Sequence, residues 1–324
     1  MWLFFNTRKW FLWSWFGAIG IIAAMWYQVQ IDVQINEWFG SFYNLIQKAL
    51  AEPNVVSLEE YFGQLWMFGE LAAVYIAVYI AVVFFTSHWL FRWRTAMAEW
   101  YHSVYDKAGK IEGASQRVQE DTIKFTRIME DLGTALVESI LVLIAFIPVL
   151  YGLSSGLMLM WIGDHQYGLF VTAIIWAAGI TVILLVVGWI LRLVGVEYDI
   201  QVKEAAYRKM LVIAEDDNNW RPKNLDDLFA DVRKIHYKNY FRYLWFNIAR
   251  ISCLQANVLV AYIILAPSIV GGLITLGVMQ QIIRAFNKVA ESMTYIFRSW
   301  PAVIELISVY KRLREFEKAI NDNS

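Results

Sequence analysis

The sequence has little of what catalytic and metal-binding sites usually need. Its 324 residues include one cysteine, Cys253, which can form no disulfide within the chain. The four histidines lack the spacing of metal ligands. No segment matches the phosphate-binding pattern G-x-x-x-x-G-K-[ST]. We therefore expect no metal site, no cofactor, no ATP site and no enzymatic activity.

Excess charge of either sign is also missing, since the formal net charge is -1. A near-neutral chain creates no overall field that attracts nucleic acid, so we expect no nucleic-acid partner. What the chain does have is apolar content. Hydrophobic residues make up 59% of it, with 16 Trp, 17 Tyr and 20 Phe, and its mean hydropathy is +0.44. Arranged in long runs, this excess indicates a protein that crosses a membrane several times.

The apolar runs predict an all-α membrane protein formed by a single domain over residues 1–324. Arg8 and Lys9 precede the first run without a small-residue cleavage site, which favours an uncleaved anchor helix. Residues 32–61 are expected to form a polar loop or short helices, with a turn at 52–54. The six expected transmembrane helices cover about 10–27, 65–90, 132–151, 167–193, 243–265 and 270–300, the last continuing to about 320.

Lysine and arginine are concentrated at the N-terminus, between the second and third helices, between the fourth and fifth, and at the C-terminus. By the positive-inside rule this distribution places both termini in the cytoplasm. Six helices that extend into the cytoplasm are typical of one type of ABC-exporter membrane domain. No nucleotide-binding half is expected to follow it, because the phosphate-binding pattern is missing.

A polar stripe rises through residues 111–148 into the third apolar helix. Steps of four and three residues place Glu120, Lys124, Arg127, Asp131, Thr134 and Glu138 on one helical face. A charge inside a membrane helix usually faces a cavity, a partner or a proton path. Alternatively, the helix simply begins in water and Glu138 reaches the interface.

The last helix has a second regularity, in which charges of alternating sign recur every seven residues. Such a face is either exposed to water, paired with other helices or part of a cavity lining, and Glu291 is a candidate for the cavity. Pro301 removes a backbone donor and should bend this helix near Phe297. The residues of the repeat are Arg284, Glu291, Arg298, Glu305 and Arg312.

Several segments resemble those of the SbmA/BacA family of bacterial peptide-antibiotic transporters. The most specific segment is residues 112–122 (EGASQRVQEDT), and the resemblance extends over nearly the whole chain. The others are residues 42–50 (FYNLIQKAL), 88–97 (HWLFRWRTAM), 204–209 (EAAYRK), 246–250 (FNIAR) and 310–314 (YKRLR). Well-known members carry a further N-terminal segment with a membrane helix, and we expect its lack to affect lateral packing rather than the six-helix core.

The resemblance implies a homodimer in the bacterial inner membrane that lies in the lipid bilayer and imports diverse peptides, driven by protons. Matching positions make Glu112, Glu120 and Glu204 candidates for carrying protons, while Glu138 rests on the stripe. The resemblance also implies a structural or gating role for five residues, which are Gln116, Arg117, Asp121, Arg250 and Arg312.

Two alternatives remain open at this stage. The chain could be the membrane subunit of an ATP-driven transporter whose ATPase is a separate chain. It could also be a membrane scaffold that transports nothing and uses its polar stripes only to hold helices together.

Overall fold

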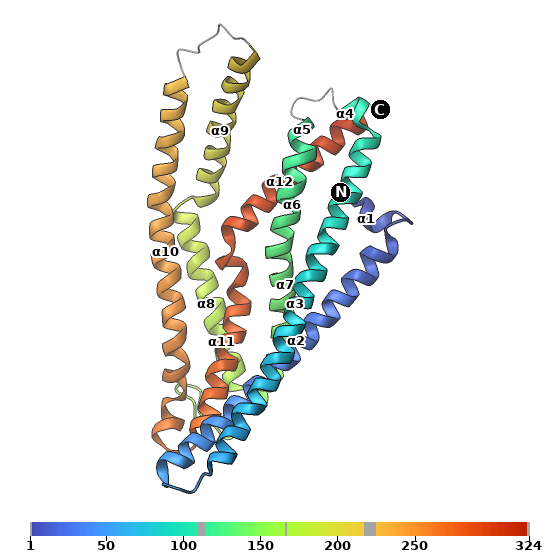
Figure 1. The fold of residues 1–324 in the computed structure, drawn as a ribbon. Helices are drawn as coiled ribbons and strands as arrows, with labels where there is room; N and C mark the ends of the chain where they lie inside the picture. Colours follow the sequence, from blue (N-terminus) through green and yellow to red (C-terminus); the bar gives the residue numbers. More distant parts are fainter. Residues whose placement is uncertain (1, 109–113, 166, 217–224, 323–324) are drawn as a thin grey trace. The chain divides into compact units, whose positions relative to one another are not determined.

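The computed structural model describes residues 2–108, 114–165, 167–216 and 225–322, and these residues are almost entirely helical (Figure 1). Within these ranges the only β pairing is an isolated bridge between Leu159 and Gly163. The expected all-α architecture is confirmed. Contacts divide the chain into one unit of residues 1–177 and 260–324 and a second unit of residues 178–259. The single domain predicted for residues 1–324 stays a prediction.

The helices are mostly longer than the apolar runs within them. The α-helices of both units follow one another along the chain, and three of them, α1, α4 and α5, are only three or four residues long. They are α1 (Leu3–Asn6), α2 (Phe11–Ala51), α3 (Leu58–Ser103), α4 (Tyr105–Ala108), α5 (Ala114–Gln116), α6 (Thr122–Ile128), α7 (Thr134–Leu153), α8 (Gly168–Ile190), α9 (Leu193–Asp216), α10 (Leu225–Val270), α11 (Leu276–Arg298) and α12 (Trp300–Asp322).

The prediction of a loop or short helices at residues 32–61 is wrong for residues 32–51. Helix α2 continues without a break to Ala51, because its second half buries an apolar face that includes Ile35, Trp38 and Leu45. Packing against α3, α7 and α11 stabilises this half, although polar residues interrupt its apolar pattern. The predicted turn at residues 52–54 is confirmed, and Asn54 adopts a positive φ of 69° there.

Residues 114–153 form one continuous helical path that contains two π-helical turns, η1 (Arg117–Asp121) and η2 (Met129–Gly133). A π turn inserts an extra residue and rotates the face that the following residues present. The polar stripe is still found on the surface. Glu138 is exposed. The four charged members of the stripe that precede it in the sequence are exposed as well, and these are Glu120, Lys124, Arg127 and Asp131.

Where a bend was predicted near Phe297, the structure has a break, since α11 ends at Arg298 and α12 begins at Trp300, just before Pro301. In the part of the chain that the structure describes, five helices are long and apolar enough to cross a membrane: α2, α3, the path 114–153, α8 and α10. The sixth expected span, residues 270–300, is not among them. Helix α11 starts only at Leu276 and carries Arg284, Lys288 and Glu291 close together, which makes it amphipathic.

The first unit has two apolar cores. One joins α2, α7 and α11 with the adjoining ends of α8 and α10, around Phe146 and Phe286. The other joins α3, α6 and α12, around Trp93, Phe125 and Leu313. Helices α2 and α3 lie side by side as a hairpin (Figure 1). The first core holds α11 against α2 and α7.

The second unit consists of the end of α8, helix α9 and most of α10. Helices α9 and α10 are joined by an ion pair between Lys203 and Asp231 at 2.5 Å and by a tilted contact between the rings of Tyr207 and Phe229. The ion pair is exposed at both ends and contributes little, about 0–1 kcal/mol.

Candidate functional site

Two glycines and three polar side chains fix helix α11 against α2. A Cβ atom on Gly277 would lie 1.9 Å from the carbonyl oxygen of Gly40, so the two backbones touch. Asn44 Oδ1 accepts the amide of Gly277 at 2.9 Å, and Gln47 Oε1 accepts that of Leu276 at 2.8 Å. Thr275 caps the same helix end by accepting from Val278. Segment 42–50 therefore positions α11.

A buried carboxylate on α2, Asp32, holds the charged face of α11. The Asp32 side chain is 8% exposed and accepts from Arg284 at 2.6 Å and from Lys288 Nζ at 2.5 Å. Arg284 and Lys288 are four residues apart, which puts them on one face of the helix. A buried carboxylate requires such partners, because desolvation strongly disfavours an unpaired charge.

The same face of α11 lines a cavity of about 300 Å³. Arg284 lies over the ring of Phe39, 4.7 Å from the ring centre. Glu291 lies one helical turn beyond Lys288 and is exposed. Five of the seven lining residues are polar or charged, and the lining comprises Phe39, Gln280, Ile283, Arg284, Asn287, Lys288 and Glu291.

Glu138 on α7 approaches this cluster from a third helix. It is exposed, and it lies within electrostatic range of Lys288 and Asp32. Asp32 and Glu138 thus provide two negative charges beside the two positive charges of Arg284 and Lys288. When all four are ionised the group is neutral, which is the arrangement that a low-dielectric environment favours. Among the sequence-predicted carboxylates, the structure brings Glu138 and Glu291 to this group.

Asp32 was not among the residues predicted from sequence. The signal that could have found it is the spacing of Gln28, Asp32 and Asn36, which recur every fourth residue on the buried face of α2. That spacing has meaning only if residues 28–36 are helical, and the sequence led us to expect a loop from residue 32 onward. Gln28 donates to the hydroxyl of Tyr75, which links this face to α3 as well.

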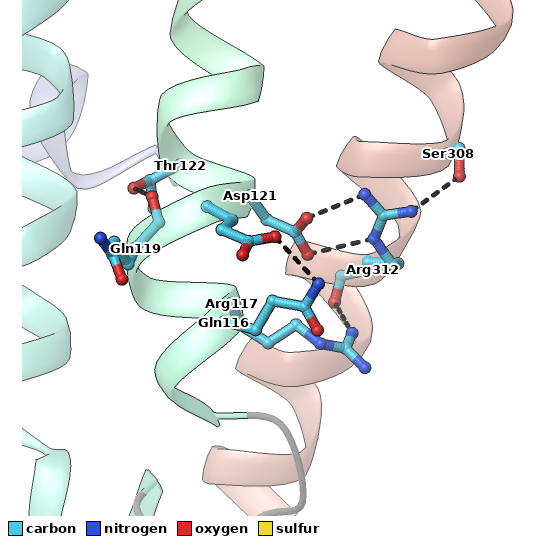
Figure 2. Close-up of polar contacts among 8 residues, drawn as sticks. Gln116, Arg117, Gln119, Asp121, Thr122, Ser308 and Arg312 are labelled. Carbon is cyan, nitrogen blue, oxygen red and sulfur yellow. Dashed lines mark hydrogen bonds and ion pairs between the residues drawn. The ribbon is translucent and has the colours of Figure 1, made fainter. Parts of the chain in front are cut away.

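A second polar cluster joins η1 to α12 (Figure 2). Asp121 is 2% exposed, and both of its oxygens accept from Arg312, at 2.8 and 3.1 Å. Arg312 also donates to Ser308 Oγ, and its carbonyl accepts from Arg117 at 3.3 Å. A bidentate guanidinium–carboxylate pair is a strong and directional contact. It clamps the start of the 114–153 path to α12.

Gln116 and Glu120 lie at the same end of this path and bond to each other, with Gln116 Nε2 donating to Glu120 at 3.0 Å (Figure 2). Of the five residues expected to have structural or gating roles, four therefore meet here: Gln116, Arg117, Asp121 and Arg312. Glu120 is exposed beside them. Glu112 lies outside the described residues.

The remaining predicted residues belong to the second unit. Glu204 on α9 is paired with His236 on α10 at 3.0 Å, and the Glu204 side chain is about half exposed. Arg250 lies partly buried on α10.

One pattern that is typical of hydrolases does occur in the sequence. Residues 152–156 read G-L-S-S-G, which matches the G-x-S-x-G turn of many hydrolases. Ser154 is completely buried at the end of α7. Its hydroxyl donates to the carbonyl of Leu150 and accepts from the amide of Leu169. It joins two helix ends, and its oxygen is not exposed to attack a substrate.

Among the described residues, no group of three or more His, Cys, Asp or Glu side chains has the geometry to hold a metal ion. The chemistry that the two clusters offer is instead ionic. Both clusters pair buried carboxylates with cations of a neighbouring helix.

Comparison with known proteins gives relatives of low identity that align over most of this chain. A protein of Synechocystis named as an uncharacterized ABC transporter ATP-binding protein is 25% identical over 98% of this chain and 48% of its own length. The inner membrane ABC transporter ATP-binding protein YddA of Escherichia coli is 22% identical over 92% of this chain and 56% of its own. The chain spans about half the length of the curated relatives it matches.

The family comparison covers almost all of the sequence. The model of the SbmA/BacA-like family matches residues 7–321, which include both polar clusters and every helix from α2 to α11. This match agrees with the resemblance of segments 42–50, 112–122 and 310–314, whose side chains cap α11 and form the Asp121–Arg312 clamp. The chain therefore belongs to the SbmA/BacA-like family, a family of membrane transporters.

Proposed function

We propose that this protein is a proton-coupled importer of peptides, including antimicrobial peptides and peptide-like antibiotics. It acts in the bacterial inner membrane as a homodimer with both termini in the cytoplasm, and it alternates between outward- and inward-facing states. The observation that supports this most is the ionic group of Asp32, Arg284 and Lys288, which lies beside a polar cavity with Glu291 in its wall and Glu138 within reach. Ionisable groups at such positions usually serve transport.

In this proposal Glu138 and Glu291 take up protons on the acidic side of the membrane. With Asp32, Glu138 and Glu291 all ionised, the three carboxylates exceed the two cations Arg284 and Lys288 by one negative charge. Protonating Glu138 or Glu291 removes this excess and so changes the balance of charge between α2, α7 and α11. That change favours one of the two states, because excess like charges repel one another and lose favourable hydration when they are buried. Glu112, Glu120 and Glu204 are the further candidates along the path. The mechanism requires no cofactor and no enzymatic step.

The proton gradient supplies enough free energy for this function. Moving one proton through 100 mV provides about 2.3 kcal/mol, and one pH unit adds about 1.4 kcal/mol. The sum of about 3.7 kcal/mol corresponds to an accumulation of several hundredfold for one proton per peptide.

The test is uptake of a labelled proline- or arginine-rich peptide into ATP-free proteoliposomes, with and without an acidic exterior. We expect uptake only with the gradient. Glu138→Gln and Glu291→Gln should abolish it, while Glu59→Gln, which removes an exposed carboxylate in the first turn of α3, should not. Proton coupling through these residues would be refuted if uptake did not depend on the gradient. It would also be refuted if uptake remained normal in all three variants.

A second function is favoured by one observation, the names of the relatives. Proteins from Synechocystis and Escherichia coli that align with this chain are named ABC transporter ATP-binding proteins. The chain would then act as the membrane part of an ATP-driven transporter. In the proteoliposomes, this alternative predicts no uptake with the gradient alone and uptake when ATP and cell extract are added. An ATPase should also copurify with the chain.

A further inference from the structure

A second cavity, of about 340 Å³, lies between α2 and α3 and is lined mainly by apolar groups. On α2 its lining includes Trp13, Gly17, Gly20 and Ala24, which recur every three or four residues and so share one face. On α3 the lining runs from Ala81 to Arg92 with the same spacing. We refer to this cavity as the α2–α3 groove. The proposed transport mechanism does not use it.

The groove has the length of one membrane leaflet. From Trp13 to Ala24 helix α2 rises by about 16 Å, and from Arg92 to Ala81 helix α3 covers the same distance. Half of the hydrocarbon core of a bilayer is about 15 Å thick. Both helices are among those apolar enough to cross a membrane. A lipid acyl chain that entered the groove at Trp13 and Arg92 would therefore end near the middle of the bilayer.

Small residues keep the groove open. A Cβ atom on Gly20 would meet no atom within 4 Å, so the space beside it is empty. A Cβ atom on Gly17, by contrast, would come within 2.6 Å of the Trp89 ring, which closes the groove toward the helix interface. Trp89 is fixed there because its indole N–H donates to the carbonyls of Trp13 and Ser14.

One end of the groove is positively charged. The guanidinium of Arg92 lies 3.8 Å from the centre of the Trp13 ring, and His88 lines the same end. Arg92 has no carboxylate within ion-pair distance among residues 2–108, 114–165, 167–216 and 225–322. Tryptophans and cations gather at the level of lipid headgroups, where a phosphate can supply the missing negative charge.

We propose that the α2–α3 groove binds one acyl chain of an anionic phospholipid, with the lipid phosphate at Arg92. The occupant is a lipid because the groove is apolar, opens to the membrane along a span and has the length of a leaflet. Its headgroup is anionic because the charged end presents an arginine without a carboxylate. Such a lipid would set the distance between helices α2 and α3 of the hairpin.

The experiment uses the full chain purified in detergent and measures bound lipid by native mass spectrometry. The probes are dioleoyl phosphatidylglycerol and dioleoyl phosphatidylcholine, which share acyl chains and differ in charge. We expect the anionic lipid to bind about tenfold more tightly. Arg92→Gln should reduce that preference to less than about twofold, while Arg8→Gln, which removes an exposed cation near the same helix end, should retain it.

A second pair of variants tests the acyl chain. Gly20→Phe fills the open space and should weaken binding of both lipids about tenfold, whereas Gly69→Phe, at another open position on α3, should not. Gly20→Leu is the milder replacement if the phenylalanine variant does not fold. The proposal is overturned if the two arginine variants behave alike, if filling at Gly20 leaves binding intact, or if glycerol 3-phosphate competes as well as the whole lipid. None of these measurements depends on transport.

Discussion

Lys288 Nζ on α11 lies 2.5 Å from Asp32 on α2, and Arg284 binds the other oxygen of the same carboxylate at 2.6 Å. One buried acid thus holds two cations of the neighbouring helix. The contact joins the part of α2 that lies beyond its apolar N-terminal run to the helix that lines the polar cavity. It makes Asp32 the residue on which the charge balance of the cavity depends most directly.

Replacing Asp32 by asparagine should destabilise the protein strongly. Arg284 and Lys288 would lose their shared counter-charge, and breaking a buried ion pair costs on the order of 3 kcal/mol. The measurement is thermal unfolding in detergent. The double variant Asp32→Asn with Lys288→Met should recover part of the loss, because it removes one of the stranded cations. If the double variant is less stable than the single one, the pairing is not what stabilises this site.

Removing one partner of the clamp at η1 should loosen the joint between the 114–153 path and α12. Arg312→Lys keeps the charge but loses the bidentate geometry with Asp121, and we expect a cost of about 1–3 kcal/mol. Arg314→Lys, an exposed position two residues away, is the matched control and should cost less than about 0.5 kcal/mol. Equal unfolding temperatures of the two variants would contradict a structural role for the clamp.

A methyl group at Gly277 should push α11 away from α2. The Cβ atom of Gly277→Ala would overlap the Gly40 carbonyl, and overpacking of this kind typically costs about 1–3 kcal/mol. Gly69→Ala adds the same atom to open space on α3 and serves as the control. We expect lower thermal stability and reduced peptide uptake for the first variant only. Unchanged uptake by a stably inserted Gly277→Ala protein would argue against a fixed α2–α11 contact.

Glu204→Gln tests a candidate of the second unit. Its carboxylate pairs with His236 through an exposed contact, so its removal should change stability by less than about 1 kcal/mol. If Glu204 carries protons, gradient-driven uptake should be lost while insertion and unfolding temperature stay normal. The comparison variant Asp231→Asn breaks the exposed ion pair with Lys203 on the same two helices and should retain uptake. Equal uptake by the two variants would remove Glu204 from the proton path.

The helical class and several local features could be read directly from the order of residues. The polar stripe through Glu120 and Glu138 depends only on helical periodicity, and its charged members lie on the exposed side of the helical path. The break before Pro301 depends on the geometry of a single residue, and it occurs at Ser299. The clamp residues Asp121 and Arg312 belong to recognisable segments, but nothing in either segment indicates that they bind each other.

Other features could not be predicted, because they depend on packing between distant parts of the chain. The apolar pattern of α2 weakens after Tyr27, so a loop was expected where packing against three neighbours keeps the chain helical to Ala51. The amphipathic α11 was expected to span the membrane as the sixth helix. Its charged face meets Asp32, a pairing that no local pattern encodes.

By itself, then, the sequence determined an all-helical membrane protein of the SbmA/BacA-like family, with a charged stripe and a broken last helix. Periodicity and propensity are local properties, so residues near in sequence suffice to reveal them. Only the tertiary structure decided which carboxylate forms ion pairs with Arg284 and Lys288, and where the two cavities open. Ion pairs between helices require close approach of side chains, and the packing of whole helices sets that approach.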